Sequence, residues 1–240
     1  IGLGMLEAHH GLHSASALAI VDELSGMAAR AHMEEPVSTA ASPGAVAVLE
    51  LALAADQLRL ALHMARGERY HAEAHSETRR NAARTGMHHQ FEVWRSVLDC
   101  HMSMRAMDVA SLRRAVEIFT HYVAEHADLV PWLEIARAHL ALCLGKPQEA
   151  LTGYTKWLAQ IEPGSNFAWD TLCVGHAEAL IAAGEASRAS EWLSGLLAHP
   201  VLASARDTAA RVTLEALLAL AQAESREVEA ATERIRMLEQ

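Results

Sequence analysis

Residues 130–158 read VPWLEIARAHLALCLGKPQEALTGYTKWL, and this stretch decides the fold. Pro131 marks the first turn of a helix that should stop at Gly145, and Pro147 marks the start of a second helix. The first helix carries the pattern W-x2-I-A-x2-H from Trp132 onward. We therefore expect two helices joined by a short turn.

The same spacing of tryptophan and histidine occurs twice more, from Trp94 to His101 and from Trp169 to His176. The tryptophans lie about 38 and 37 residues apart, and a fixed period of that size is typical of stacked helix pairs. Caps and breakers elsewhere predict helices over about residues 1–10, 14–31, 44–66, 68–86, 87–105, 110–128, 165–184, 185–199, 203–222 and 226–240.

Composition agrees with an all-α fold, because hydrophobic residues make up 51% of the chain and aromatic residues only 5%. The three cysteines, Cys100, Cys143 and Cys173, lie in apolar helical patterns, which indicates buried thiols in a reducing, cytoplasmic compartment. No apolar run approaches the roughly 18 residues of a membrane span, and no signal peptide is evident. The chain begins at Ile1 inside a helical pattern, so we expect a segment excised from a longer protein.

A second pattern places a small residue four positions before a large one on the partner helices. It is found at Ala115-x3-Phe119, Ala150-x3-Tyr154 and Ala189-x3-Leu193, and prolines follow at Pro163 and Pro200. A small residue lets two helix backbones approach, and the large residue fills the groove beside it.

Together the two patterns resemble the tetratricopeptide repeat, whose signature is W-x2-L-G-x2-Y…A-x3-F…P. The resemblance implies antiparallel helix pairs stacked into a right-handed superhelical solenoid, about six pairs in all. It implies one domain over residues 1–240, with degenerate repeats in 1–85 and better-defined repeats in 86–240. The longer period also resembles the helical domains of MalT-like bacterial regulators, which implies the regulatory part of a multidomain signalling or transcription protein.

Sites for catalysis or metal binding are not indicated. The pairs His9/His13 and His71/His75 have helical spacing but no third ligand at a diagnostic distance, so we expect no metal and no cofactor. No phosphate loop, nucleophile elbow or kinase motif is present, so we expect no catalytic residues.

The net charge of −10 argues against direct binding of nucleic acid. The arginine-rich segment 66–114 is either a solvated helix face or a docking site for an acidic or phosphorylated partner.

His101, His139 and His176 admit two interpretations. In the structural one, each fills the aromatic position of its repeat and hydrogen-bonds a neighbouring helix. In the functional one, burial lowers their pKa values and forms a pH-sensitive seam, so that acidification loosens the array.

We therefore expect a non-catalytic recognition or scaffolding domain that binds a peptide, a protein segment or a small effector in a concave groove. Carrying over the phase of the repeat, the groove should be lined by polar residues of the first helices. These are Glu92, Arg95, Arg137, Asp170, Glu178 and Arg211. The alternatives are a spacer or self-association module, which would form homo-oligomers, and an enzyme with an unfamiliar helical active site.

Overall fold

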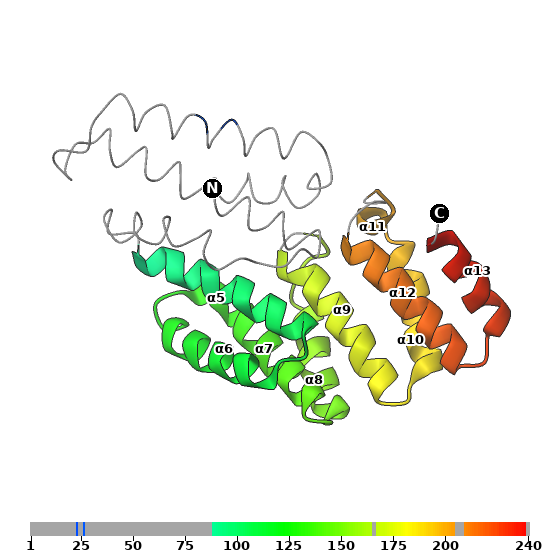
Figure 1. Ribbon diagram of the computed structural model, residues 1–240, viewed down its shortest axis with the longest axis horizontal. Helices are drawn as coiled ribbons and strands as arrows, with labels where there is room; N and C mark the ends of the chain where they lie inside the picture. The colour runs from blue at the N-terminus through cyan, green and yellow to red at the C-terminus, as the bar shows by residue number, and fades with distance from the viewer. Residues whose placement is uncertain (1–22, 24–25, 27–87, 165–166, 205–208, 239–240) are drawn as a thin grey trace. The chain divides into compact units, whose positions relative to one another are not determined.

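The computed structural model describes Glu23, Gly26 and residues 88–164, 167–204 and 209–238. The chain divides into two compact units, Ile1–Leu98 and Asp99–Gln240. The helices expected before residue 87 and the pairs His9/His13 and His71/His75 lie outside the described residues. The described helices accordingly form the second unit and the helix that leads into it (Figure 1).

All regular structure in the described ranges is helical, and they contain no strand, which confirms the all-α prediction. The helices are α5 (His88–Arg105), α6 (Val109–Tyr122), α7 (Val130–Cys143), α8 (Pro147–Leu158), α9 (Phe167–Ala182), α10 (Ala186–Leu197), α11 (Pro200–Ser204), α12 (Ala209–Glu224) and α13 (Val228–Leu238), with the short 3-10 helix η2 (Ala127–Leu129) before α7.

Most of these helices agree with the sequence-based boundaries, and three details differ. The helix expected over 203–222 corresponds to α12, which begins at Ala209, and Ala203 and Ser204 belong to α11. The helix expected over 110–128 ends at Tyr122, because the chain forms η2 before it reaches Pro131. Pro200 was expected only to follow a helix, but it begins the short helix α11. A proline fits the first turn of a helix because its missing N–H has no partner there.

The first helix of each pair ends in the same left-handed turn. Gly145, just after α7, has φ +72°, and its N–H donates to the Leu142 carbonyl at 3.0 Å. The next N–H, from Lys146, donates to the Ala141 carbonyl at 2.9 Å. This pair of bonds is the Schellman motif. The motif recurs at Met107, Gly184 and Arg226, all with positive φ.

The four turns give a measure of the repeat that does not depend on tryptophan. Met107, Gly145, Gly184 and Arg226 lie 38, 39 and 42 positions apart along the chain. The second helix of each pair begins with a matching backbone bond, the first donors being Leu112, Ala150, Ala189 and Ala231. The described part of the second unit is therefore built from similar helix pairs.

The small and large residues predicted for the second helices are all buried, but one of them is out of register. Ala150 and Ala189 lie five residues after their left-handed turns, and Leu112 occupies that place in α6. Ala115, which the sequence pattern equates with these alanines, lies almost one turn later. The pattern thus identified core residues of α6 correctly and misplaced them within the repeat.

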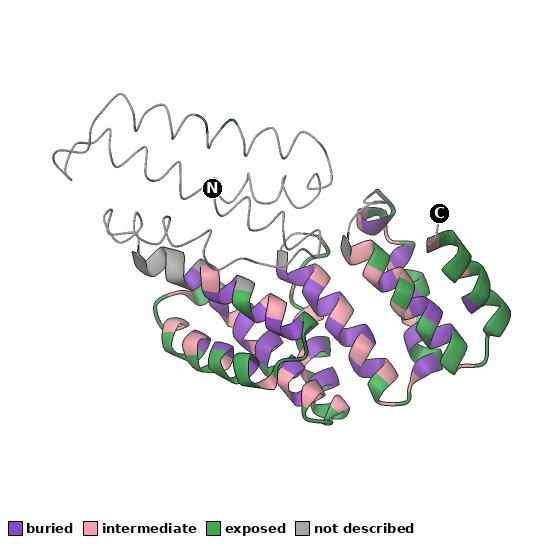
Figure 2. Cartoon of the chain, viewed as in Figure 1, coloured by how far each residue is buried: buried purple, intermediate pink, exposed green. Residues whose placement is uncertain are grey.

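Packing follows the order of the chain. α6 packs on α7, α7 on α8, α8 on α9, α9 on α10, α10 on α12, and α12 on α13. In addition, α7 packs beside α9 and α9 beside α12. The buried side chains accordingly line the seams between neighbouring helices, while α13 is largely exposed (Figure 2).

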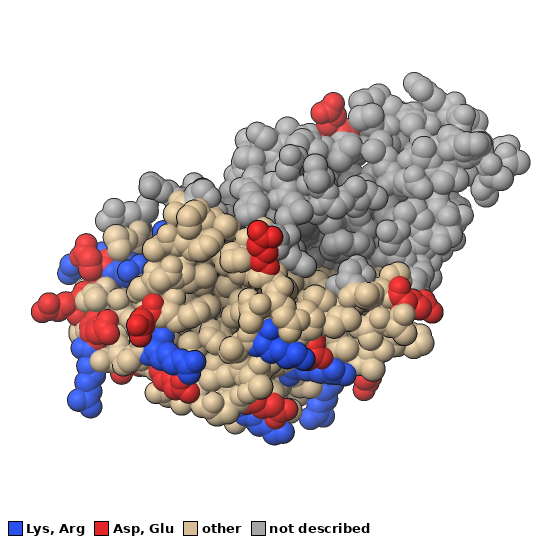
Figure 3. All heavy atoms as spheres, turned by 180° about the vertical axis from the view of Figure 1, so that it is seen from behind, with Lys and Arg blue, Asp and Glu red and all other residues tan. Residues whose placement is uncertain are grey.

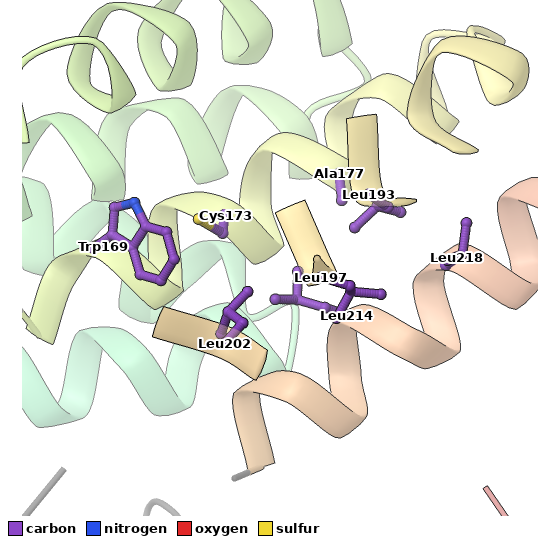
Figure 4. Packing of buried hydrophobic residues seen from close by; sticks show 8 residues of the cluster. All are labelled: Trp169, Cys173, Ala177, Leu193, Leu197, Leu202, Leu214 and Leu218. Carbon is purple, nitrogen blue, oxygen red and sulfur yellow. The ribbon is translucent and has the colours of Figure 1, made fainter. Parts of the chain in front are cut away.

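The best-defined apolar cluster joins α9 to the helices that follow it (Figure 4). Its members on α9, α10 and α12 are spaced four residues apart, which places them on one face of each helix. The Leu202 side chain of α11 completes the cluster. The cluster consists of Trp169, Cys173, Ala177, Leu193, Leu197, Leu202, Leu214 and Leu218.

Candidate functional site

The His139 ring on α7 is deeply buried, with 2% of the residue exposed. Its Nε2 lies 3.1 Å from the Met104 carbonyl oxygen, and its Nδ1 lies 3.0 Å from the Tyr154 hydroxyl. A carbonyl oxygen can only accept, so Nε2 must carry the proton. In the neutral ring, Nδ1 is then an acceptor, and the Tyr154 hydroxyl donates to it. Both ring nitrogens are satisfied.

Tyr154 reaches this position because α9 has a glycine opposite its ring. Tyr154 is fully buried on α8, and a Cβ atom on Gly175 would overlap the Tyr154 Cζ atom. Any side chain at that position would therefore collide with the tyrosine ring. A continuous chain of contacts results, from Gly175 of α9 through Tyr154 of α8 and His139 of α7 to the Met104 carbonyl of α5.

His139, Tyr154 and the Met104 carbonyl form a polar cluster. Glu178 of α9 approaches this polar cluster from a side that is partly open to solvent. Its Oε2 lies 3.9 Å from His139 Nδ1, and 35% of its side chain is exposed. Within the described residues, no hydrogen bond to this carboxyl group is found. The Glu178 carboxyl therefore faces a ring nitrogen whose lone pair is already used by Tyr154.

Burial changes the acidity of these three groups. It raises the pKa of Glu178 from 4.5 to about 7. It also lowers the pKa of His139, an effect that the hydrogen bond to the Met104 carbonyl partly opposes. The pKa of Tyr154 is raised well above 10 by burial and, to a lesser degree, by the nearby Glu178 carboxyl. At neutral pH, His139 and Glu178 thus do not form a full ion pair, and Glu178 exchanges its proton near pH 7.

The sulfur atoms near this cluster differ in burial. Cys100 and Cys173 are buried, as the sequence predicts, but Cys143 is only half-buried. Its Sγ lies 3.7 Å from the Met107 Sδ. Burial raises the pKa of the Cys143 thiol, and the Glu178 carboxyl raises it further. The three thiols are free and favour the protonated form.

The other two histidines of the tryptophan pattern behave differently from His139. His176 is buried against Trp192 of α10, with ring centroids 4.6 Å apart, and its Nδ1 has no hydrogen-bond partner within the described residues. Burial, followed by the charge of Arg188, lowers its pKa to about 4. His101 is half-buried, and its Nδ1 lies 3.5 Å from the Thr171 hydroxyl. The expected hydrogen bond to a neighbouring helix is thus made by His139 and, at a longer distance, by His101, whereas His176 packs through its ring.

The six residues expected to line a groove lie in different surroundings. Arg137 is exposed on α7 and pairs with Glu134 at 2.6 Å. Arg211 of α12 is held in place, because it donates to the Leu202 carbonyl at 2.7 Å and pairs with Glu215 at 2.9 Å. The structure brings Glu178 to the polar cluster and none of the other five. Asp170 on α9 and Arg95 on α5 are half-buried, and Glu92 lies on α5 with its side chain outside the described set.

Tyr154 and Gly175 were not singled out by sequence as parts of a polar cluster. The left-handed turns nevertheless show which residue of α9 corresponds to His139 of α7. Glu178 precedes Gly184 by six residues, as His139 precedes Gly145. Counting back from the turn therefore equates Glu178 with His139, whereas counting from the tryptophan equates His176 with it. The difference arises because the segment from Trp169 to its turn is two residues longer.

Charged side chains of both signs are found on the described surface. Acidic and basic side chains are interspersed on the face seen in Figure 3. Among the described residues, no group of three or more histidine, cysteine, aspartate or glutamate side chains is arranged to hold a metal ion. None of the described helices has the length and apolar character needed to cross a membrane.

Comparison with protein-family models, with curated proteins and with solved structures yields no match to this chain.

Proposed function

We propose that the second unit is a right-handed solenoid of tetratricopeptide-like helix pairs that acts as a recognition domain. The supporting observation is the same left-handed turn at the end of each first helix, combined with the close packing of α7 on α9 and of α9 on α12. In the described part of the chain, the second helices α6, α8 and α10 approach one another less closely. Helices that lie closer together line the inner side of a curved stack. The concave surface is therefore assigned to α7, α9 and α12.

The ligand of this surface is a peptide, a protein segment or a small effector. Four of the six residues expected from the sequence lie on this layer, namely Arg137, Asp170, Glu178 and Arg211. Arg137 is the residue best suited to meet an acidic group. Its partner among the described residues, Glu134, lies three residues earlier on the same helix, and such a pair is weak. The guanidinium can exchange that partner for a ligand carboxylate, to which it offers two parallel donors.

A non-catalytic role agrees with the polar cluster. His139 and Tyr154 bind each other, and the remaining His139 nitrogen binds the Met104 carbonyl. These hydrogen bonds connect α5, α7 and α8, so the cluster stabilises the packing of the helices. We further propose that the domain belongs to a cytoplasmic, multidomain bacterial regulator and that its ligand or partner controls the neighbouring domains.

The proposal is tested by a thermal-shift screen with acidic and basic peptides, sugars and nucleotides. A ligand that binds only the folded chain, present at a hundred times its dissociation constant, adds about 2.7 kcal/mol of stability. For an acidic ligand, Arg137→Glu should abolish the shift. Lys156→Glu is the matched control, because it reverses an exposed charge on the second helix α8. Equal loss in both variants would show that only net charge matters and would refute a site on α7, and a screen without any shift would count against the recognition role.

A further inference from the structure

The hydrogen-bond donors close to the Glu178 carboxyl on α9 are engaged elsewhere. The Tyr154 hydroxyl donates to His139 Nδ1, and the other nitrogen of that ring binds a backbone carbonyl. The Cys143 thiol, whose pKa the Glu178 carboxyl raises, donates to the Met107 Sδ at 3.7 Å. Within the described residues, none of these donors serves the Glu178 carboxyl, although 35% of its side chain is open to solvent.

The basic residues of the layer formed by α7, α9 and α12 have acidic partners on their own helices. Arg137 pairs with Glu134 at 2.6 Å, and Arg211 pairs with Glu215 at 2.9 Å. These are the only lysine or arginine residues on the three helices. Burial disfavours the charged form of Glu178 and raises its pKa to about 7. A cation brought to this carboxyl from outside would stabilise its charge.

Apolar side chains continue the surface beside this carboxyl. Val174 lies one turn before Glu178 on α9 and is half-buried. Leu220 on α12 is 46% exposed, and it precedes Arg226 by six residues, as Glu178 precedes Gly184. The helices α9 and α12 pack together and run in the same direction (Figure 1). Leu220 therefore lies at the level of Glu178 on the neighbouring helix.

A lysine or arginine side chain matches the α9 part of this surface, because it carries a cationic head on an apolar stem. The head would meet Glu178 while the stem lies on Val174. Packed helix axes are about 8–10 Å apart, which corresponds to about three residues of extended chain. A second, apolar side chain of the same segment would then reach Leu220.

We infer that Glu178, Val174 and Leu220 bind an extended peptide segment with a lysine or arginine side chain close to an apolar one. This inference rests on the recognition role proposed above and adds the chemical class of the ligand. The carboxyl of Glu178 selects the cationic side chain, and Leu220 contacts the apolar one.

An array of end-capped octapeptides tests the charge contact with the whole chain at about pH 8, where Glu178 is ionised. Each peptide carries one fixed lysine among neutral residues, and a matched peptide carries norleucine, which lacks only the amino group. Fluorescence anisotropy then measures the affinities of the best pairs. The wild type should bind the lysine peptides roughly tenfold more tightly than their norleucine counterparts, because the ion pair is partly buried.

Glu178→Gln keeps the shape of the side chain and removes its charge, so it should abolish this preference without unfolding the chain. Lysine and norleucine peptides should then bind within about threefold of each other. Glu191→Gln is the matched control, because it neutralises an exposed glutamate on the second helix α10 and should keep the preference.

The possible failures are distinguishable. Peptides that bind the wild type without a preference for lysine would overturn the inference and leave the recognition role intact. Loss of the preference in both variants would show that only net charge matters, and it would likewise overturn the inference. An array on which no peptide binds would contradict peptide recognition itself, and the inference with it.

Leu220→Asn tests the apolar contact. It should weaken the best lysine peptides by roughly threefold to tenfold, because it replaces an apolar contact with a polar side chain. Met237→Asn is the control, since Met237 is 54% exposed on α13, outside the layer of α7, α9 and α12. Equal losses in the two variants, or no loss in Leu220→Asn, would show that the bound segment does not cross α12, and the inferred surface would be wrong.

Discussion

Replacing Glu178 with glutamine should stabilise the protein above neutral pH. The pKa of the Glu178 carboxyl is raised by burial from 4.5 to about 7, so the folded chain holds this proton more tightly than the unfolded chain. The stability that comes from this proton is fully present below about pH 4.5 and is lost as the pH rises to about 7. Because glutamine cannot ionise, the variant does not lose this stability as the pH rises.

The size of the effect depends on the shift and on the exposure of the side chain. One pKa unit corresponds to about 1.4 kcal/mol, so full burial would give roughly 3 kcal/mol for this shift. Because 35% of the Glu178 side chain is exposed, water screens part of the cost. We therefore expect the glutamine variant to be about 1 to 2 kcal/mol more stable than the wild type at about pH 8, and the difference to be much smaller at about pH 5.

The histidines change the shape of the pH profile. Burial lowers the pKa of His139 and of His176, the latter to about 4. Their contribution to stability is present above pH 6.5, the ordinary value, and is lost as the pH falls below it. In the wild type, Glu178 offsets this loss. The glutamine variant lacks this offset, so its stability should fall more steeply on acidification than that of the wild type.

Urea unfolding followed by far-UV circular dichroism at several pH values measures these differences. The control is Glu191→Gln, which neutralises an exposed glutamate on α10. The reasoning fails if Glu178→Gln is no more stable than the wild type at about pH 8, or if the difference is the same at about pH 5. It also fails if the control shows the same dependence on pH.

Four further substitutions test packing and backbone conformation elsewhere in the described helices. Tyr154→Phe removes the hydroxyl that donates to His139, and the unpaired Nδ1 should cost about 1 to 3 kcal/mol in urea unfolding. Gly175→Ala places a Cβ atom against the Tyr154 ring and should cost about 1 to 3 kcal/mol. Gly195→Ala has open space and should instead stabilise α10 by up to about 1 kcal/mol, so equal effects at the two glycines would refute the close approach. Arg226→Gly relieves a residue with φ +70° and should raise the melting temperature by a few degrees, while a fall would show that the arginine is not strained.

Much of the helical order could be predicted because its signals are local. Pro131, Gly145 and Pro147 act on the backbone of their own neighbourhood, and the structure starts and ends helices beside them. The left-handed turns at Met107 and Arg226 were less obvious, since these side chains disfavour positive φ. In both cases, the two backbone hydrogen bonds of the Schellman motif form despite this local preference.

The polar cluster could be predicted only in part, because its bonds join residues far apart in the sequence. His139 was expected to be buried and hydrogen-bonded, and it is. Its second partner, the Met104 carbonyl, lies 35 residues earlier, and no local pattern points to it. The acidity of Glu178 likewise depends on how deeply α9 is covered. The spacing of residues along one helix predicts on which face this side chain lies, but it does not predict how deeply the neighbouring helices bury it.

The central position of α9 also determines how the protein opens. This helix packs on α7, α8, α10 and α12, whereas α13 packs closely on α12 alone in the described chain. Amide hydrogens deep in a helix exchange with solvent only when their hydrogen bonds open, and that opening must break the surrounding contacts. Exchange should therefore be slowest in α9 and fastest at α13. Glu178 lies on the slowest helix, yet its carboxyl reaches solvent, so it gains and loses its proton while the chain stays folded.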